Sequence, residues 1–482
     1  MGSSDQTAMN RILNLLDDNS FVEIGARVTK RNTDFNLDGK DVPADGVITG
    51  YGMIDGNIVY VYSQDASMLG GAIGEMHAKK IVNVYNLARK IGVPVIGLVD
   101  CAGMRLQEAT DALDAFGLVY ANKVMASGVI PQITAVFGNC GGGVAVANAL
   151  GDFTFMESEH AKVFVSSPNV LDGNYTDKLD TASAKFQSEN GNVDFVCSEG
   201  EIFNEIRTLV TLLPSNNEDC DSYDECNDDL NRASAAFDGD LSDPRNAIRD
   251  LSDDGFFMEV KKDYAKDMVV GFIRLNGMTV GVVANASAVV DEEGKKVEEF
   301  DKALTTGGCE KAAHFVNVCN AFAIPVLTLT NVKGYKCTVE EEKNIGHQVA
   351  KLTYAFANAD VPKVNLIVGE AFGSAYISMN SAHIGADLVF ALPNAKIGMM
   401  DAEQAAKIMY ADEIKNASDA AGKISEKAAE YEKLQSSVDA AASRGYVDNI
   451  IEGSSVRKQM IFAFEMLFTK REDRPFKKNG TI

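Results

Sequence analysis

The chain has 482 residues, 46% of them apolar, and a formal net charge of -24. That length and apolar content suit two or three globular domains with large cores, while the lack of an apolar run of about 20 residues excludes a membrane span. Nucleic-acid binding is excluded because no cluster of Lys and Arg offers the basic face that phosphates require, and the N-terminus lacks the apolar core of a secretory signal, so we expect a cytoplasmic protein.

The first predicted elements are a β-hairpin and a helix that leads into a buried strand. Apolar and polar residues alternate in GVITGYGMIDGNIVYVYSQ, residues 46–64, around Asp55-Gly56, where glycine supplies the positive φ of a tight hairpin. Residues 83–103, NVYNLARKIGVPVIGLVDCAG, then change from helical periodicity to a continuous apolar run.

A run of glycines ends the next predicted strand. In ITAVFGNCGGGVAVA, residues 133–147, an apolar strand meets Gly141, Gly142 and Gly143 before a helix of small residues begins. The first amides of a helix have no partner within it, and the helix dipole adds positive potential there. Such a turn can hold negative charge that develops on an oxygen, and we expect glycines because any Cβ would obstruct the ligand's approach.

An acidic stretch divides the chain. Residues 215–245 combine Asn, Asp, Glu and Ser with few large apolar residues, a composition typical of a linker. We therefore predict an N-terminal domain over residues 1–214, an acidic linker over residues 215–245 and a C-terminal domain over residues 246–482.

The second half repeats the pattern of the first. A hairpin signal surrounds Asn276-Gly277, and Pro362 precedes Gly373 by the same distance as Pro131 precedes Gly142. A period of roughly 230 residues is too long for a solenoid and implies duplicated domains. Because strands and helices alternate in each half, the sequence predicts an α/β fold.

The glycine turns have two competing interpretations. A phosphate loop would carry the Lys and Ser or Thr of GxxxxGK[ST], which do not follow Gly143. Tight packing of a helix on a sheet would explain one glycine-rich turn. Its recurrence at matching places in two halves favours an oxyanion hole made of backbone amides.

The histidines and carboxylates favour structural roles. The five histidines lack metal-ligand spacing, and no GxSxG elbow occurs. We interpret His77, on a predicted helix, as a structural histidine. Asp100 and Glu108 could orient a substrate, but they equally suit helix capping and surface charge.

The eight cysteines contain no CxxC pair and indicate reduced thiols. Cys101 and Cys140, near the glycine turn, are expected to be small buried residues. Cys220 and Cys226 lie in the acidic stretch, where a solvated linker is preferred over metal binding.

Five stretches together resemble one known family: ADGVITGYG, YSQDASMLGGAIGEMHAKKI, DCAGMRLQEA, ASGVIPQITAVFGNCGGG and RGYVDNII. The chain is similar to the biotin-dependent acyl-CoA carboxyltransferases, which include the β subunit of propionyl-CoA carboxylase, the transcarboxylase core and the α subunit of methylmalonyl-CoA decarboxylase. The resemblance covers nearly the whole chain, with the motifs in order.

The resemblance implies two crotonase-like domains of spiral ββα units in each chain, and a ring of dimers that totals six subunits. It places the active site where the N-domain of one protomer faces the C-domain of another. It also implies that the amides of Gly142 and Gly143 bind the thioester oxygen of acyl-CoA and that the turn at Ser374 and Ala375 holds the ureido oxygen of biotin. The cofactor-binding residues expected beside these catalytic ones are Gly141, Gly373, Tyr376 and Ile377.

The resemblance further implies carboxyl transfer between biotin and the α-carbon of an acyl-CoA, of the methylmalonyl-CoA/propionyl-CoA or the malonyl-CoA/acetyl-CoA class. No Met-Lys-Met biotinylation site occurs, so biotin is expected on a separate carrier protein. The other expected partner is a biotin carboxylase or a membrane decarboxylase subunit, to which a cytoplasmic chain would dock.

The C-terminal half departs from the family pattern at three places. The usual Gly-Gly-Ala is here Gly373-Ser374-Ala375, and the usual DVPGF is NVKGY, residues 331–335. Ile377 is apolar where propionyl-preferring members often carry Asp.

Two other functions remain open from the residues alone. A biotin-independent crotonase-type hydratase or isomerase would need a positioned Glu or Asp base and would turn over enoyl-CoA. A non-catalytic scaffold subunit would be stabilised by neither CoA esters nor biotin.

Overall fold

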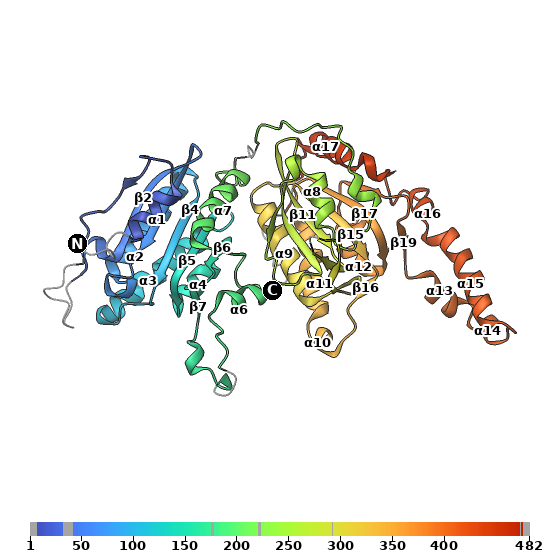
Figure 1. Ribbon diagram of the computed structural model, residues 1–482, viewed down its shortest axis with the longest axis horizontal. Helices are drawn as coiled ribbons and strands as arrows, with labels where there is room; N and C mark the ends of the chain where they lie inside the picture. Colours follow the sequence, from blue (N-terminus) through green and yellow to red (C-terminus); the bar gives the residue numbers. More distant parts are fainter. Residues whose placement is uncertain are drawn as a thin grey trace. The chain divides into compact units, whose positions relative to one another are not determined.

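The computed structural model describes residues 7–31, 42–174, 178–219, 223–291, 293–472 and 474–475. The chain forms two compact units, Met1–Ser222 and Tyr223–Ile482 (Figure 1). Within the described residues, no helix combines the length and the apolar character needed to cross a membrane. The predicted domain boundaries and the roles given to the two halves stay predictions.

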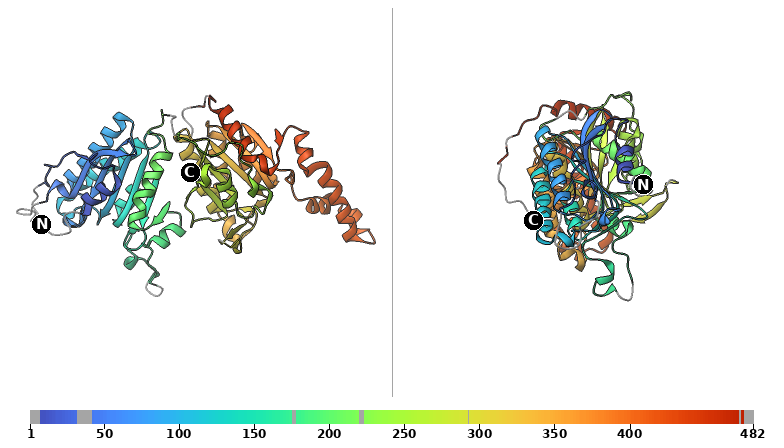
Figure 2. Two further views of the ribbon diagram at one scale, coloured as in Figure 1. Left: turned by 45° about the horizontal axis from the view of Figure 1, so that its top comes forward. Right: turned by 90° about the vertical axis from the view of Figure 1, so that its left-hand side faces the viewer.

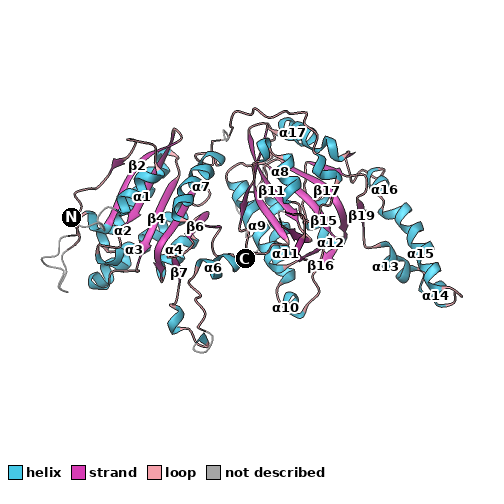
Figure 3. Ribbon diagram, viewed as in Figure 1, coloured by secondary structure: helices cyan, strands magenta, loops and turns pink. Residues whose placement is uncertain are grey.

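The first unit contains one mixed sheet with helices on both faces (Figures 1 and 3). Its strands lie in the order β1-β2-β3-β4-β5-β6-β8, and β7 also pairs with β5. The strands are β1 (Val22–Glu23), β2 (Val47–Ile54), β3 (Asn57–Gln64), β4 (Val95–Cys101), β5 (Gln132–Gly141), β6 (Phe153–Glu157), β7 (Lys162–Phe164) and β8 (Phe195–Cys197). The pairs from β3 onward are parallel.

Four helices of this unit form two packed pairs. The helices of the unit are α1 (Thr7–Leu15), α2 (Glu75–Ile91), α3 (Ala109–Ala126), α4 (Gly143–Ala149), α6 (Ala184–Glu189) and α7 (Glu199–Leu212). α2 packs against α3, and α1 packs against α7. Figure 2 shows the two pairs on opposite faces of the sheet. The core between the sheet and the first pair includes Ile81, Val84, Phe116 and Val119, which recur at helical spacing.

The second unit repeats this topology. Its strand order is β20-β18-β17-β15-β11-β10-β9, and β19 also pairs with β17. The strands of this sheet are β9 (Met258–Val260), β10 (Met268–Leu275), β11 (Met278–Asn285), β15 (Val326–Val332), β17 (Lys363–Phe372), β18 (Leu388–Ala391), β19 (Lys396–Gly398) and β20 (Asn449–Ile450). Two small sheets pair β12 (Ala288–Val290) with β13 (Lys296–Glu299) and β14 (Ala303–Leu304) with β16 (Gly334–Tyr335).

The helices of the second unit are α8 (Arg245–Leu251), α9 (Thr306–Ala321), α10 (Val339–Glu342), α11 (Ile345–Asn358), α12 (Gly373–Ser378), α13 (Ala402–Met409), α14 (Ala411–Lys415), α15 (Ala420–Tyr431), α16 (Val438–Ala442) and α17 (Val456–Leu467). α9 pairs with α11 as α2 pairs with α3. α13 and α15 pack on each other around Ala402, Ala406 and Ala428, a cluster separate from the main core of the unit.

Local contacts confirm the duplication. Both hairpins turn through two residues of positive φ, Asp55-Gly56 and Asn276-Gly277, as the sequence predicts. The strand that leads into the glycine turn of each unit is also fixed in the same way. Asp152 accepts a hydrogen bond from the amide that opens β5, and Asp387 accepts one from the amide that opens β17, both at 2.8 Å. The α/β fold expected from the sequence is therefore confirmed.

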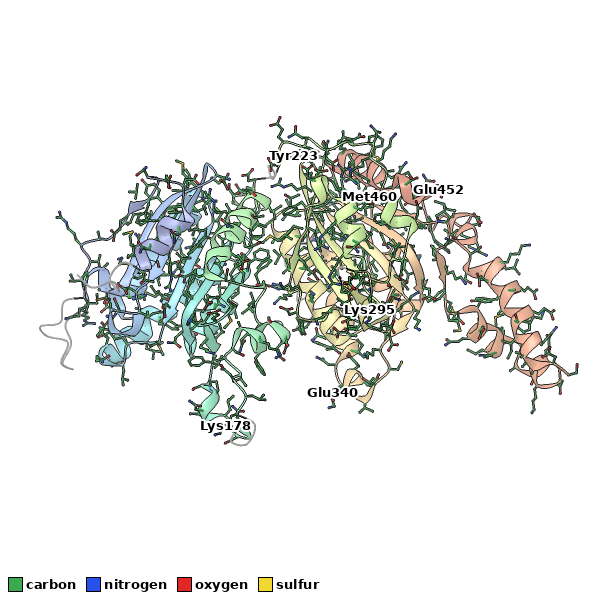
Figure 4. All side chains as sticks on the ribbon, viewed as in Figure 1. Lys178, Tyr223, Lys295, Glu340, Glu452 and Met460 are labelled. Atoms are coloured by element: carbon green, nitrogen blue, oxygen red, sulfur yellow. The ribbon has the colours of Figure 1, made fainter. Side chains whose placement is uncertain are left out.

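The acidic stretch is packed onto the second unit where it is described. From Tyr223 (Figure 4), which bridges antiparallel to Met278, it runs along this unit. The fully buried guanidinium of Arg457 lies 2.6 Å from Asp253 and 3.4 Å from Asp228. Because these contacts fix the chain on both sides of residue 245, this part of the stretch is a folded segment and not a free tether.

Candidate active site

The glycine turn of the first unit joins β5 to α4. Gly142 has φ 61° and ψ -128°, a combination that only glycine adopts without strain. Its N–H donates to the carbonyl of Phe164 at 2.8 Å. This amide is therefore already paired within the protein in this geometry, and the role expected for Gly142 as an oxyanion donor stays a prediction.

The donors that remain are the next two amides. The N–H of Ala145 donates to the carbonyl of Gly142 at 3.1 Å, whereas among the described residues no backbone oxygen accepts from Gly143 or Val144. Both amides lie in the first turn of α4, where a helix has no internal acceptor for them. Gly143 therefore stays a predicted donor, and Val144 offers a second unpaired amide beside it.

The three glycines are required for two different reasons. A Cβ on Gly141 would lie 2.8 Å from the ring of Phe164, and a Cβ on Gly143 would lie 2.8 Å from the ring of Phe116. A Cβ on Gly142 would meet nothing within 4 Å. Gly142 is required by its positive φ, and it is the one glycine of the three whose Cβ would project into open space on the side where a ligand could approach. The other two glycines are needed for packing, which corrects the expectation for the triplet.

The corresponding turn of the second unit joins β17 to α12. Gly373 has φ 63°, which matches Gly142. Among the described residues, no backbone oxygen outside the helix accepts from the amides of Ser374 or Ala375. The side chain of Ala375 is buried, so its contribution to a site is its amide alone. Both residues stay predicted oxyanion donors.

A pocket of about 470 Å³ opens beside this second turn. Its lining includes four of the predicted site residues, namely Gly373, Ser374, Tyr376 and Ile377. Its lining also includes His383 and Tyr446, whose rings lie 5.4 Å apart. The structure therefore brings these predicted residues together within the second unit, and Gly141 to Gly143 form a separate set in the first.

A strand bulge lies beneath each of the two turns, and only one of the two bulge residues was a candidate from the sequence. The register of β4 with β5 shifts at Asp100, and that of β15 with β17 shifts at Asn331. Asp100 Oδ1 accepts from the amide of Asn139 at 3.2 Å, and Asn331 Oδ1 accepts from the amide of Glu370 at 3.1 Å. Each side chain thus supports the strand that leads into a glycine turn. The signal for Asn331 was its matching position in the repeat.

Glycines face both of these bulge residues. A Cβ on Gly138 would lie 2.1 Å from Asp100 Oδ1, and a Cβ on Gly369 would lie 2.5 Å from Asn331 Oδ1. The close approach leaves room for the side chain that accepts the hydrogen bond. Asp100 is therefore a structural residue of the turn in this arrangement.

A buried ionic cluster fixes the loops around the first turn. Arg105 lies 2.5 Å from Asp45 and 2.7 Å from Glu108, and all three side chains are fully buried. Glu108 also accepts from the amide of Glu75, the first residue of α2, at 2.6 Å. Glu108 therefore caps a helix, one of the roles that its position suggested.

His77 belongs to the same cluster. Its Nδ1 lies 3.0 Å from the carbonyl of Asp45, and its Nε2 lies 3.1 Å from Gln64 Nε2. Burial lowers the pKa of His77 to about 3, so the ring is neutral when the protein is folded. Because both ring nitrogens have partners, His77 is a structural histidine, as the sequence predicts.

The thiols near the first turn are unreactive. Cys101 and Cys140 are buried in adjacent strands, and desolvation raises their pKa values to about 11 and about 12. Cys220 lies outside the described residues. Within the ranges that the structure describes, no three His, Cys, Asp or Glu side chains gather as metal ligands.

Comparison with known proteins places this geometry in a family. The family model "Carboxyl transferase domain" matches residues 3–482. The chain belongs to the carboxyl transferase family. As a carboxyl transferase it is an enzyme, and the resemblance read from its motifs is confirmed.

Two curated relatives and one solved structure show how closely this carboxyl transferase follows its family. It is 38% identical to the methylmalonyl-CoA decarboxylase subunit alpha of Propionigenium modestum, over 100% of this chain and 93% of that protein. It is 40% identical to a putative propionyl-CoA carboxylase beta chain of Bacillus subtilis (strain 168), over 99% of this chain and 93% of that protein.

The solved structure is transcarboxylase 12S, a hexamer with methylmalonyl-coenzyme A and methylmalonic acid bound. It matches 98% of this chain and 91% of its own with a TM-score of 0.92 and 36% identity. This match confirms the expected fold of two duplicated crotonase-like domains.

Proposed function

We propose that this carboxyl transferase moves a carboxyl group between biotin and the α-carbon of an acyl-CoA thioester. The observation that carries the proposal is that both units of the chain contain the same turn, in which a strand ends at a glycine of positive φ and a helix begins. Two such turns suit a reaction in which two different oxygens become negatively charged. Family membership over residues 3–482 supports the same conclusion.

The first turn suits the thioester. Loss or gain of a carboxyl group beside a thioester passes through an enolate, whose charge collects on the thioester oxygen. Amides held in place before the reaction stabilise that charge, and one such donor contributes about 2.7 to 4 kcal/mol. We assign this role to the amides of Gly143 and Val144, which the described backbone leaves without an acceptor.

The second turn suits biotin, which is a substrate of this chain and is carried on a separate protein. When a carboxyl group leaves the ring nitrogen of biotin, negative charge collects on the ureido oxygen. We assign the amides of Ser374 and Ala375 to that oxygen. The pocket of about 470 Å³ beside them has room for a bicyclic ring.

The overall exchange balances without a side-chain base. In the decarboxylating direction, the bond from the α-carbon to the carboxyl group breaks and a bond from that carboxyl group to the biotin nitrogen forms. The proton of that nitrogen passes to the α-carbon. The two oxyanion sites stabilise the negative charge on the thioester oxygen and on the ureido oxygen of biotin. No side-chain base is needed, which agrees with the structural roles of His77, Asp100 and Glu108.

The relatives suggest the substrate class and the assembly. Names that include methylmalonyl-CoA decarboxylase and propionyl-CoA carboxylase favour the methylmalonyl-CoA/propionyl-CoA class. The related transcarboxylase 12S is a hexamer, and we propose a homohexamer for this chain too. Its partners would be a biotin carrier protein and either a biotin carboxylase or a membrane decarboxylase subunit.

The test is carboxyl transfer by the purified full-length chain. Methylmalonyl-CoA labelled in its free carboxyl group is incubated with the protein and a high concentration of free biotin. We expect label to be released as CO2 in proportion to the biotin added, because carboxylated biotin breaks down in water. Release that is independent of biotin, or no release at all, would contradict the proposal.

A further inference from the structure

A pair of hydroxyl groups lies at the second glycine turn. The hydroxyl of Tyr335, on β16, donates to Ser374 Oγ at 2.7 Å, a normal length for a hydrogen bond between hydroxyl groups. Tyr335 and Ser374 come from segments that are 39 residues apart in the sequence. Both positions depart from the family pattern. The second residue of the turn is usually glycine and the last residue of DVPGF is phenylalanine, and neither of these carries a hydroxyl group.

Each partner is held by its own element. Tyr335 pairs with Leu304 in the small parallel sheet of β14 and β16. The carbonyl of Ser374 accepts from the hydroxyl of Ser378 at 3.1 Å, and the hydroxyl of Thr353 on α11 lies 2.9 Å from that of Ser378. These contacts anchor the backbone segments from which the two hydroxyl groups project.

The direction of the bond leaves one proton for a ligand. Ser374 Oγ accepts from Tyr335, so its own hydrogen points elsewhere, and no acceptor for it occurs among the described residues. The side chain is exposed and lines the pocket of about 470 Å³. An accepted hydrogen bond polarises a hydroxyl group and makes it a better donor.

A second side chain in the same pocket lacks a partner. Tyr376 is 4% exposed, and its hydroxyl has no hydrogen-bond partner within the described ranges. A buried hydroxyl without a partner costs about 1 to 3 kcal/mol, so such a group points to a ligand that satisfies it. Tyr376 takes no part in the contact between Tyr335 and Ser374, and its ring lies 6.2 Å from that of His383.

We propose that Ser374 is a catalytic residue whose hydroxyl donates to the ureido oxygen of biotin, and that Tyr335 is the positioning residue that holds this hydroxyl. The inference rests on the proposed function, to which it adds a side-chain donor beside the two backbone amides. Ser374 touches the oxygen on which charge develops. Tyr335 acts only through Ser374.

The experiment compares four variants of the full-length protein in the biotin-dependent assay: Ser374→Ala, Ser374→Thr, Tyr335→Phe and the double variant Ser374→Ala/Tyr335→Phe. Loss of one oxyanion donor lowers kcat by about 10² to 10³, and we expect Ser374→Ala at the lower end because two amides remain. Ser374→Thr keeps the hydroxyl and should restore most of the rate. Tyr335→Phe should lower kcat about 3- to 10-fold, as loss of one neutral hydrogen bond does.

The double variant separates positioning from a general effect. If Tyr335 acts through Ser374, then Tyr335→Phe should have no further effect once the serine hydroxyl is absent. Tyr410→Phe removes a tyrosine hydroxyl on the α13 to α15 segment and serves as the matched control, with an unchanged rate expected. Circular dichroism melting curves of all variants show whether each one is folded.

Each result has a distinct meaning. A wild-type rate in folded Ser374→Ala, while the wild-type protein still requires biotin, would overturn this inference and leave the proposed function intact. Additive effects of the two substitutions would overturn the role of Tyr335. A wild-type protein that does not require biotin would overturn both the inference and the proposed function.

Discussion

The hydroxyl of Tyr120, on α3, donates to the carbonyl oxygen of Gly143 at 2.7 Å. The carbonyl of Gly143 and the N–H of Val144 belong to one planar peptide group. Tyr120 therefore fixes the direction of an amide that we assign to the thioester oxygen. The ring of Phe116 lies beside that of Tyr120, with 5.1 Å between their centroids, so a packed face of α3 supports the first turn.

Replacement of Tyr120 by Phe removes this hydrogen bond and keeps the ring. We expect kcat/KM for methylmalonyl-CoA to fall about 3- to 10-fold, since one neutral hydrogen bond contributes about 0.5 to 1.5 kcal/mol. The KM for free biotin should not change. Tyr51→Phe, at a half-exposed tyrosine of β2, is the matched control. A fall shared equally by both variants would exclude the positioning role of Tyr120.

Two alanine substitutions distinguish the roles of neighbouring glycines. Gly143→Ala places a Cβ 2.8 Å from the ring of Phe116, so we expect a lower melting temperature. Gly142→Ala places its Cβ in open space at a positive φ, which costs about 1 to 3 kcal/mol of strain and obstructs the ligand's side of the turn.

The two variants should therefore differ in whether the carboxyl-transfer rate or the melting temperature is affected more. Gly142→Ala should lose activity well beyond its loss of stability, whereas Phe116→Leu should restore part of the stability of Gly143→Ala by making room. Thermal melting and the carboxyl-transfer rate are measured on the same preparations. If Gly142→Ala is fully active, no ligand approaches that face of the turn.

The bulge residue Asp100 can be tested with its own counterpart in the repeat. Asp100→Asn keeps an oxygen for the amide of Asn139, as Asn331 does for Glu370, and loses only the charge that lies 3.5 Å from Arg11, which still has Glu199 at 3.3 Å. We expect a change within about 1 kcal/mol. Asp100→Leu leaves the amide without its acceptor and should destabilise the first unit by about 1 to 3 kcal/mol. Equal effects of the two substitutions in denaturant titrations would contradict this role.

The buried neutral His77 gives a pH dependence of stability. Its pKa is 6.5 in the unfolded chain and about 3 in the folded one, so between these values only the unfolded chain binds the proton. The stability contribution of His77 is complete above about pH 6.5 and is lost as the pH falls towards about 3. The advantage of the wild type over His77→Gln should narrow by about 2 kcal/mol between pH 7 and pH 5.

The measurement is the free energy of unfolding of both proteins at each pH, followed by circular dichroism in denaturant. The difference between the two proteins removes the contribution of other titrating groups, such as Asp152, whose pKa burial raises to about 6. An advantage that stays constant over this range would mean that His77 takes up a proton in the folded state.

Much of the fold follows from local patterns. The two hairpins were predictable because Asp55-Gly56 and Asn276-Gly277 are turn sequences between alternating strands, and the duplication was predictable from the spacing of Pro131 and Pro362 to their glycines. These signals lie within short stretches of the chain. The position of the acidic stretch depends instead on Arg457, which is more than 200 residues away from its partner Asp253.

The positions of the two turns could be predicted from the sequence, but the individual amides and hydroxyl groups available at each turn could not. The glycine runs identified both turns. Which amides are available depends on Phe164, whose carbonyl occupies the N–H of Gly142, and on how β7 lies against β5. The contact between Tyr335 and Ser374 likewise joins two elements whose approach no local pattern encodes.

The central claim is that the chain moves a carboxyl group from an acyl-CoA to biotin. The direct measurement uses methylmalonyl-CoA with a ¹³C-labelled free carboxyl group and free biotin, with the products captured under cold alkaline conditions and identified by mass spectrometry. We predict labelled carboxylated biotin and propionyl-CoA in equal amounts, both abolished when biotin is left out. Propionyl-CoA formed at the same rate without biotin, and with no label on biotin when it is present, would contradict the claim.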